Sequence, residues 1–285
     1  MSDYDPRTTP ARGDIAAEHL RGKVPAGRYA AGEPHEVIRS HTGLFRAARV
    51  NAPLDTELLA GERFVVYEHA GVWAWGQAEL DGYVGYVRSG ELEPAGQQAT
   101  HRVSVRQSRL YNEPSGKAQA LLALSLGAKL RVLRDLGRFS EVRFGSICFV
   151  PSAHIVPISQ VSPDYVATAE QFLGVAYVWG GRTSLGLDCS ALVQLSLAEA
   201  GIKAPRDSDM QREALGESLG GAEALAQMRR GDLVFWKNHV ATAIDNKRIL
   251  HANALAMAVS IDEAVAFARA VEPGEGPVIA VKRLK

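Results

Sequence analysis

Cys189 is the residue of this 285-residue sequence whose surroundings most favour nucleophilic chemistry. A Gly-rich stretch from Gly180 leads to it, and the helical pattern of 189–200 begins at the thiol. Unsatisfied amides and the positive end of a helix dipole favour thiolate, and such sites lower a thiol pKa from about 8.5 to roughly 3.5–7.5. An isolated cysteine at a helix start is more commonly a buried structural residue, so its neighbourhood has to decide.

Two histidines could supply the base that a thiol nucleophile requires. His239 starts the strand-like run 239–245, and His251 lies in the run 248–253, with Asp245-Asn246-Lys247 as the turn between them. Adjacent antiparallel strands would bring the two imidazoles side by side. A nucleophile, a base and a residue that orients the base form a complete set for covalent catalysis.

Zinc binding is the alternative use of the same residues, since thiolate and imidazole are both zinc ligands. Each histidine taken singly is more commonly a satisfied strand residue. No second cysteine lies near Cys189, no carboxylate is placed as a fourth ligand, and the six other histidines show no relation to this pattern. The sequence therefore predicts a site with no metal and no other cofactor.

An α+β domain over 159–285 has to position these residues. Ser162-Pro163-Asp164 predicts a helix start, with Ser162 as the cap and proline in the first turn. Strands following a helical half are typical of this fold class. The expected helices run from 163 through 173, over 189–200 and over 207–215, and the expected strands lie near 232–236, 239–245 and 248–253.

An internal repeat precedes this domain. Leu44-Phe45 recurs as Leu110-Tyr111, and Gly71-Val72-Trp73 recurs as Gly137-Arg138-Phe139. Each copy alternates apolar and polar residues between closely spaced turn signals, which predicts two small antiparallel β-barrels. The predicted boundaries are an irregular or partly helical leader over 1–36, a first barrel over 37–97 and a second over 98–158.

Five short segments of the C-terminal domain form a recognisable series: Tyr177-Val178-Trp179-Gly180-Gly181, Asp188-Cys189-Ser190, Arg230-Gly231-Asp232-Leu233-Val234-Phe235-Trp236, His239-Val240-Ala241 and Ile249-Leu250-His251-Ala252. In these residues and their order the domain resembles the NlpC-type cysteine peptidases, a branch of the papain-like fold that cleaves peptidoglycan peptides. Ala191 stands where the family usually has glycine, and Asn238 where it often does. The resemblance implies that Cys189 is the nucleophile, His239 the general base and His251 the third member.

The two repeats resemble bacterial SH3-like domains, which narrows the resemblance to γ-D-glutamyl-L-diamino acid endopeptidases. In that subgroup the first SH3-like domain closes one end of the cleft, so that only peptides with a free N-terminal L-Ala fit. A carboxylate that pairs with the substrate ammonium offsets the cost of burying that cation. The resemblance assigns this role to Asp207, supported by Ser208, whereas the plainer interpretation makes Asp207 the N-cap of a helix over 208–215.

Five further residues are expected to bind substrate. The first repeat offers Tyr83, favoured over Tyr86 by the resemblance, and strand alternation puts these two side chains on opposite faces. Tyr177 and Trp179 could line the cleft, although core aromatics are the commoner interpretation. The remaining two flank the nucleophile: Asp188, which would position substrate or hold the loop, and Ser190.

Composition excludes several classes of protein. With 32 basic and 32 acidic side chains, the chain lacks the excess of cations that nucleic-acid binding and polybasic membrane anchoring require. The first residues contain no apolar run of a signal peptide, and no stretch reaches the length of a membrane helix, so we expect a cytoplasmic protein. The only cysteines, Cys148 and Cys189, are expected to be free thiols.

The predicted function is hydrolysis of the γ-D-glutamyl to L-diamino acid bond in peptidoglycan stem peptides with a free N-terminal L-Ala, as part of cell-wall recycling. The expected partners are L-Ala-γ-D-Glu-diamino acid peptides. Two alternatives stay open: an inactive module that binds wall peptides, and an acyltransferase or amidase, since fold and catalytic residues do not fix the acyl acceptor.

Overall fold

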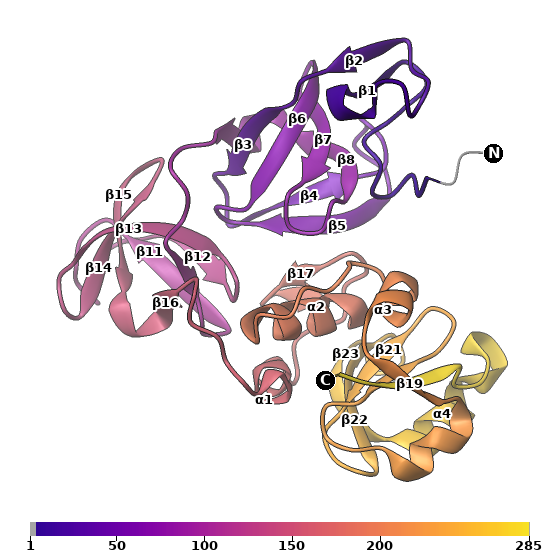
Figure 1. Ribbon diagram of the computed structural model, residues 1–285. Coiled ribbons are helices and arrows are strands. Elements are labelled where there is room, and N and C mark those ends of the chain that lie inside the picture. The colour runs from indigo at the N-terminus through magenta and orange to yellow at the C-terminus, as the bar shows by residue number, and fades with distance from the viewer. Residues whose placement is uncertain (1–3, 285) are drawn as a thin grey trace. The chain divides into compact units, whose positions relative to one another are not determined.

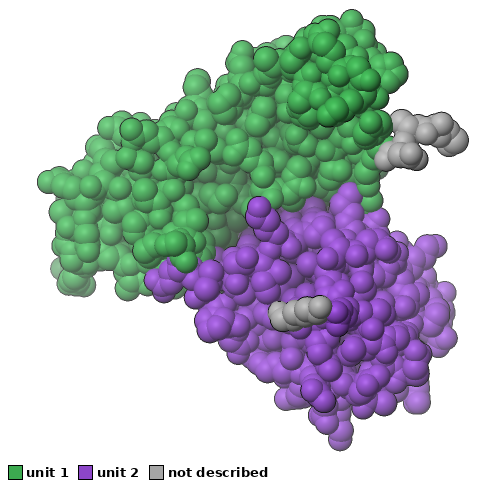
Figure 2. All heavy atoms as spheres, in the orientation of Figure 1, with its two compact units in different colours: residues 1–159 green, residues 160–285 purple. Residues whose placement is uncertain are grey.

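The computed structural model describes residues 4–284 and divides the chain into two compact units, residues 1–159 and 160–285 (Figures 1 and 2). The first three residues, which begin the predicted leader, lie outside the described residues. The first unit is built from strands, and the second combines helices with a six-stranded sheet. Each unit has its own hydrophobic core.

The first barrel, residues 33–94, is a seven-stranded antiparallel sheet in the order β5-β4-β8-β7-β6-β3-β9. Alternate side chains such as Leu44, Phe64 and Val87 point into its core, because successive residues of a strand face opposite sides. Its strands are β3 (Glu33–Val37), β4 (His41–Phe45), β5 (Leu54–Leu59), β6 (Arg63–Ala70), β7 (Trp73–Ala78), β8 (Val84–Arg88) and β9 (Leu92–Pro94), with a 3-10 turn η2 (Ser89–Glu91) before the last.

The second barrel, residues 101–157, repeats this topology strand for strand, in the order β12-β11-β15-β14-β13-β10-β16. The irregularities repeat as well: pairing shifts at Leu44/Phe45 in the first barrel and at Leu110/Tyr111 in the second. The repeat in the sequence is therefore a repeat of structure. Its elements are β10 (His101–Val103), β11 (Gln107–Tyr111), β12 (Ala120–Ser125), β13 (Lys129–Asp135), β14 (Phe139–Phe144), β15 (Ser146–Pro151), η3 (Ser152–His154) and β16 (Ile155–Pro157).

A backbone contact joins the two barrels within the first unit. Gly61 has a positive φ of 70°, and a Cβ there would collide with the carbonyl oxygen of Lys129. Beside it, the Lys129 N–H donates a 2.8 Å hydrogen bond to the carbonyl of Ala60. Glycine is thus required at residue 61 by both its backbone conformation and the close approach of the second barrel.

The leader is more ordered than the sequence predicts. It contains β1 (Ile15–Ala17), a 3-10 turn η1 (Glu18–Leu20) and β2 (Arg28–Ala30), and β1 pairs with β2 in parallel. Ala16, Ala17 and Leu20 are buried and pack with Tyr67 of β6. The expectation of an irregular or partly helical segment missed this pair, because strands of three residues are too short to show a periodicity.

The second unit holds a six-stranded sheet in the order β19-β24-β20-β21-β22-β23. Leu233 and Phe235 of β20 pack with α2, and Val234 and Trp236 face the opposite side with α4. The elements are α1 (Tyr165–Glu170), β17 (Arg182–Thr183), β18 (Gly186–Leu187), α2 (Cys189–Glu199), α3 (Ser208–Ala214), β19 (Glu217–Gly220), η4 (Ala222–Gln227), β20 (Leu233–Phe235), β21 (Val240–Ala243), β22 (Arg248–Asn253), β23 (Ala258–Glu263), α4 (Ala264–Glu275) and β24 (Ala280–Arg283).

The predicted hairpin is confirmed: β21 and β22 pair antiparallel, with Thr242 opposite Leu250. Asp245 closes its turn by accepting hydrogen bonds from the N–H groups of Lys247 and Arg248. The predicted helix cap at Ser162 is wrong. Asp164 is the N-cap of α1, because its carboxylate accepts the Ala167 N–H at 2.9 Å, a bond that a serine two residues earlier cannot reach. Within residues 4–284, no helix has the length and apolar character needed to cross a membrane.

Candidate active site

Cys189 is the first residue of α2, as the sequence predicts. The residue before it, Asp188, is the N-cap and accepts the Ala191 N–H at 2.8 Å. The thiol is buried against β21, and the backbone of Val240 hydrogen-bonds to the sulfur. Because Val240 directly follows His239, this contact fixes the nucleophile within one residue of the predicted base.

A chain of hydrogen bonds leads from His239 to a carboxylate. His239 Nε2 lies 2.7 Å from His251 Nδ1, and His251 Nε2 lies 3.0 Å from the Asp262 carboxylate. An ionised carboxylate can only accept, so His251 carries its proton on Nε2 and accepts at Nδ1. His239 must then donate through Nε2, which leaves the lone pair of its Nδ1 for a proton from sulfur.

Asp262 is a functional residue that sequence reasoning missed. It lies on β23, where the Ser260 hydroxyl donates to it at 2.7 Å, and Asn253 in turn donates to that hydroxyl at 2.8 Å. The register places Ser260 opposite His251, with Asp262 two residues further on the same face. The sequence signal was this Ser-x-Asp alternation, but its meaning depends on strand register.

An aromatic wall covers the two imidazoles. Phe267 of α4 packs edge-on against His251 with ring centroids 4.3 Å apart, and Trp236 lies 5.5 Å from the His239 ring. The wall removes the rings from water, which strengthens the polar contacts between them. The sequence predicts no helix over 264–275, so the contribution of Phe267 is visible only in the structure.

Burial governs the protonation of the catalytic pair. Burial, together with the negative charge of Asp188, raises the pKa of the Cys189 thiol to about 12. Burial and the neighbouring His251 lower the pKa of His239 to about 3. The helix start favours thiolate, as the sequence indicates, but burial acts in the opposite direction on the thiol. Burial likewise disfavours the imidazolium form of His239, so neither group is favoured as a charge on its own.

The carboxylate of Asp262 is held in its charged form. Partial burial works against ionisation, but the hydrogen bonds from Ser260 and His251 outweigh it and lower the pKa of Asp262. Burial lowers the pKa of His251, and Asp262 opposes that shift. A neutral imidazole between a charged carboxylate and a neutral base suits an orienting residue.

Asp188 is fully engaged by protein groups. Buried Arg206 donates to both of its oxygens, at 2.9 and 2.6 Å, and the Gly180 N–H adds a bond of 3.0 Å. The Ser190 hydroxyl donates to Asp188 at 3.2 Å and accepts from Arg206 at 2.9 Å. Of the two roles predicted for Asp188, this geometry favours holding the loop, and it gives Ser190 a structural role beside it.

Asp207 and Ser208 lie at the start of α3. They directly follow Arg206, which donates hydrogen bonds to Asp188. Asp207 is the N-cap residue, but its side chain makes no cap hydrogen bond to α3. Gln211 donates to the carbonyls of Ser190 and Pro205, each at 2.9 Å, and so fastens the start of α3 to the start of α2. The plain N-cap interpretation of Asp207 therefore applies to its backbone and not to its carboxylate.

Tyr177 and Trp179 line a cavity of about 410 Å³ together with His239 and Glu275. Trp179 is 69% exposed, so it is not a core aromatic. Burial, together with the nearby Cys189, Asp188 and Glu275, raises the pKa of the Tyr177 hydroxyl. Tyr177 is therefore a neutral hydrogen-bond donor close to the sulfur.

Tyr83 and Tyr86 have different environments in the first barrel. Tyr83 belongs to the core of the first barrel and is 5% exposed. Tyr86, on the opposite face as the alternation predicts, is half-buried, and its hydroxyl accepts a 2.6 Å hydrogen bond from Arg12 of the leader. Burial therefore distinguishes the two tyrosines: Tyr83 packs in the core of the barrel, whereas Tyr86 is only partly buried.

The geometry does not suit a zinc ion held by Cys189, His239 and His251. Both nitrogens of His251 are engaged, one by His239 and the other by Asp262. A zinc ligand needs one imidazole nitrogen free for the metal. The buried arrangement instead suits proton transfer along a fixed chain of hydrogen bonds.

Comparisons with known proteins agree with this arrangement. Residues 174–266 match the NlpC/P60 family, and residues 44–92 match the bacterial dipeptidyl-peptidase Sh3 domain. The gamma-D-glutamyl-L-lysine dipeptidyl-peptidase of Bacillus subtilis is 26% identical over 219 residues, which cover 70% of this chain and 72% of that protein. A probable endopeptidase NlpC homolog of Haemophilus influenzae is 38% identical over 86 residues, 29% of this chain and 44% of that protein.

Among solved structures, an NlpC/P60 family protein from Bacillus cereus matches 88% of this chain and 99% of its own, with a TM-score of 0.74 and 20% identity, which shows the shared fold. The family match spans Cys189, His239, His251 and Asp262, and the Sh3 match falls on the first barrel alone. The chain thus joins an NlpC/P60 domain to a bacterial SH3 domain, and is homologous to the gamma-D-glutamyl-L-lysine dipeptidyl-peptidases.

Proposed function

We propose that this protein is a cysteine endopeptidase that hydrolyses the γ-D-glutamyl to L-diamino acid bond of peptidoglycan stem peptides whose N-terminal L-Ala is free. The observation that carries the proposal is the chain of hydrogen bonds from His239 through His251 to Asp262, next to a buried thiol, Cys189, that the backbone of Val240 contacts. Homology to gamma-D-glutamyl-L-lysine dipeptidyl-peptidases supports the choice of substrate.

The reaction starts when the sulfur of Cys189 attacks the γ-carbonyl carbon of D-Glu and its proton passes to Nδ1 of His239. His251 and Asp262 hold the imidazole in the required tautomer and stabilise the imidazolium that forms. The charges on sulfur and imidazole arise together, because burial disfavours either of them alone.

The oxyanion of the tetrahedral intermediate needs donors that are already in position. The backbone amides at the start of α2 are one source, and the Tyr177 hydroxyl, kept protonated by its raised pKa, is a second. His239 then protonates the amine of the departing diamino acid. Water, activated by the same imidazole, releases L-Ala-γ-D-Glu from the thioester.

Asp207 is the proposed partner of the L-Ala ammonium, with Ser208 as its support. The bonds from Gln211 and Arg206 tie this segment to the residues around Cys189. Tyr86, rather than Tyr83, is the tyrosine of the first barrel that we propose to contact the peptide.

The test of the proposal compares L-Ala-γ-D-Glu-L-Lys with its N-acetyl derivative, measured as dipeptide release by mass spectrometry. We expect N-acetylation to abolish cleavage. Asp207→Asn should lower kcat/KM for the free peptide by about 10- to 100-fold, the value of a hydrogen bond to a charged group. Asp209→Asn, in the first turn of the same helix, is the matched control. Equal cleavage of both peptides would refute the requirement for a free amine.

The requirement for a free L-Ala amine also implies that another reaction comes before this one. In intact peptidoglycan this nitrogen is held in an amide bond to the glycan, so an amidase has to act first. We therefore propose a role in recycling released stem peptides in the cytoplasm. Intact cross-linked wall should accordingly be a much poorer substrate than free tripeptide.

The departing diamino acid has a matching candidate residue. Glu275 lines the same cavity as His239, the group that protonates the leaving amine, and its carboxylate suits a side-chain ammonium. Glu275→Gln should lower kcat/KM for a peptide ending in L-Lys by about 3- to 10-fold, because a partly exposed ion pair is worth little. A norleucine peptide should show no change, and Glu272→Gln is the control on the same helix. An equal loss on both peptides would contradict this assignment.

The acid limb of the pH profile of kcat/KM should report the protonation of His239. With the pKa of His239 lowered to about 3, the base stays unprotonated far below the usual value of 6.5, so activity should persist in mildly acidic buffer. Burial is the larger cause and His251 the second. His251→Gln should therefore move the acid limb of kcat/KM to higher pH, although not beyond 6.5. A limb that stays in place would show that His251 does not influence the base.

Product analysis separates the proposal from its two alternatives. Release of the dipeptide indicates a peptidase, and a new conjugate with an added amine indicates an acyltransferase. Peptide binding without turnover would indicate an inactive module. The completed hydrogen-bond chain to Asp262 favours turnover, since a binding module gains nothing from a tautomer-fixed base.

A further inference from the structure

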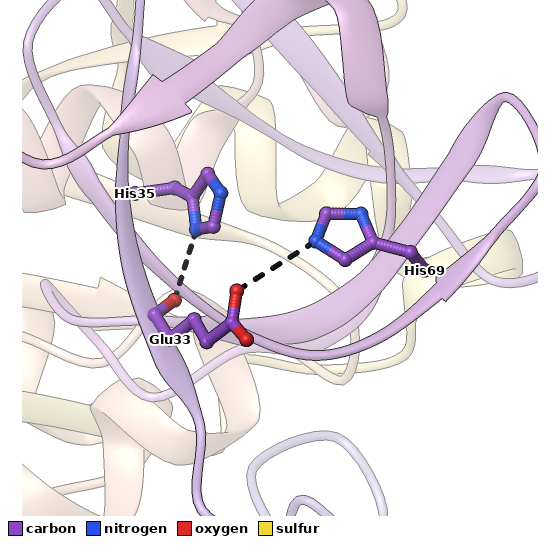
Figure 3. Close-up of side chains that lie close together, drawn as sticks. All are labelled: Glu33, His35 and His69. Carbon is purple, nitrogen blue, oxygen red and sulfur yellow. Dashed lines mark hydrogen bonds and ion pairs between the residues drawn. The ribbon is translucent and has the colours of Figure 1, made fainter.

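Two histidines and a glutamate converge on the first barrel, where β3 begins and β6 ends (Figure 3). Glu33 and His35 are two residues apart on β3, so their side chains share a face. His69 is the penultimate residue of β6. One ligand atom from each of the three side chains lies within 4.8 Å of the other two.

The backbone holds the start of β3 firmly against β6. A Cβ at Gly32 would collide with the Val65 side chain and the Tyr67 ring, so only glycine lets the chain pass this close before Glu33. Glu33 then pairs with Val66 and His35 with Phe64 in the sheet. The positions of the two β3 side chains are therefore set by strand pairing.

The buried histidine is oriented as a metal ligand would be. His35 is 8% exposed, and its Nδ1 lies 3.0 Å from the carbonyl oxygen of Glu33. A carbonyl can only accept, so Nδ1 carries the proton and the lone pair resides on Nε2. Metal-binding histidines commonly donate their other N–H to a backbone carbonyl in this way, which fixes ring and tautomer.

We propose that Glu33, His35 and His69 bind a divalent transition-metal ion, with zinc as the best match. Two imidazoles and one carboxylate, with a position left for water, form an established zinc ligand set. Zinc bonds of about 2.0–2.1 Å put tetrahedral ligand atoms roughly 3.4 Å apart. The ligand atoms now lie within 4.8 Å of one another, so they would have to approach by at most about 1.4 Å.

The two outer side chains have the freedom to make that movement. The Glu33 side chain is 75% exposed and that of His69 is 52% exposed, with 4.0 Å between their nearest polar atoms. An ion pair between these two alone would be weak at such exposure, and it would not account for the orientation of His35. A metal ion uses all three groups.

The charged residues near the proposed metal site are compatible with a bound cation. The side chains of Glu33 and His69 also border a cavity of about 440 Å³, to which Arg28 and Glu68 contribute. The guanidinium of Arg28 is already paired with the Glu68 carboxylate, which limits its repulsion of a bound ion. Bound metal would clamp the entry of β3 to the end of β6, beside the residues through which the leader joins the barrel.

The test is titration of the full-length chain with Zn²⁺ and with Co²⁺, followed by calorimetry and by the visible absorption of bound cobalt. The Cys189→Ala background removes the thiol as a competing metal ligand. We expect one ion per chain in that background. Removing a metal ligand should lower the metal affinity at least as much as removing a hydrogen-bond partner of a ligand. His35→Gln and His69→Gln should therefore each weaken metal binding by about 100-fold or more. Glu33→Gln should weaken it less.

His41→Gln is the matched control, because His41 lies 3.6 Å from Glu57 in the same barrel but belongs to no group of three potential metal ligands among the described residues. Its affinity should equal that of the Cys189→Ala parent. His69 and Glu33 are exposed, so their variants remain informative if the buried His35 variant fails to fold. No binding in the parent at millimolar metal, or equal binding by the His69 and His41 variants, would overturn the proposal. These outcomes do not depend on peptidase activity.

Discussion

Replacing Cys189 with alanine should abolish hydrolysis of L-Ala-γ-D-Glu-L-Lys, with a loss of about 10⁴-fold or more in kcat. The effect is this large because the sulfur forms the bond that is made and broken, and no other described thiol lies in the second unit. The measurement is the release of L-Ala-γ-D-Glu, followed by mass spectrometry. The variant should fold normally, because Asp188 still caps α2 and alanine favours a helix.

Cys148→Ala provides the matched control. Cys148 is also a buried free thiol, but it belongs to the core of the second barrel. Its replacement should leave the rate unchanged. If Cys189→Ala retained the parental rate, the proposed nucleophile would be wrong; if Cys148→Ala lost it as well, activity would depend on thiols in a way that the site does not explain.

Replacing Arg206 with alanine should destabilise the second unit by about 3–5 kcal/mol, because it leaves the carboxylate of Asp188 buried without its counter-ion. The loss should extend to catalysis, since Asp188 joins the Gly180 loop to the start of α2. Hydrogen exchange followed on peptides from residues 189–200 of the full chain would measure the change in the unit concerned.

Arg230→Ala is the control for this prediction. Arg230 also pairs with carboxylates, those of Asp164 and Glu170, but at the surface, where an ion pair contributes about 0–1 kcal/mol. The double variant Asp188→Asn with Arg206→Met should be less destabilised than Arg206→Ala, because it buries no unpaired charge. A loss below 1 kcal/mol in Arg206→Ala would mean that water reaches Asp188 and replaces the guanidinium.

Local signals allowed the catalytic hairpin to be predicted from sequence. The turn at Asp245-Asn246-Lys247 is stabilised locally, because the Asp245 carboxylate accepts hydrogen bonds from the N–H groups of Lys247 and Arg248. Such a short loop restricts how the two flanking strands can pair. The placement of His251 next to His239 follows from that geometry. The helix beginning at Cys189 was equally local, because Asp188 caps it.

Asp262 and Phe267 could not be predicted in the same way. Asp262 reaches His251 because β23 pairs with β22 in one register, and a shift by one residue would turn its carboxylate to the other face. The role of Phe267 depends on how α4 packs, because the apolar residues of a helix do not by themselves show which side chains the helix covers. The pKa of Cys189 could not be predicted for a related reason: a helix start is visible in sequence, whereas the depth of burial around the sulfur is not.

The N-terminal unit shows the same division between local and long-range information. The repeat was visible because the two copies keep corresponding glycines and apolar residues, and the structure gives both the same strand order. The choice between Tyr83 and Tyr86 depended on which face of β8 is inside the barrel. The short β1–β2 pair of the leader depends on packing against Tyr67, a contact across more than thirty residues of sequence.

The contact between Gly61 and Lys129 has an evolutionary consequence. Repeated barrels are often treated as modules that genes can exchange one at a time. Here a substitute first barrel with any side chain at residue 61 would push away the Lys129 carbonyl and strain the neighbouring bond to Ala60. A first barrel from another protein can therefore replace this one only if it carries glycine at the corresponding position.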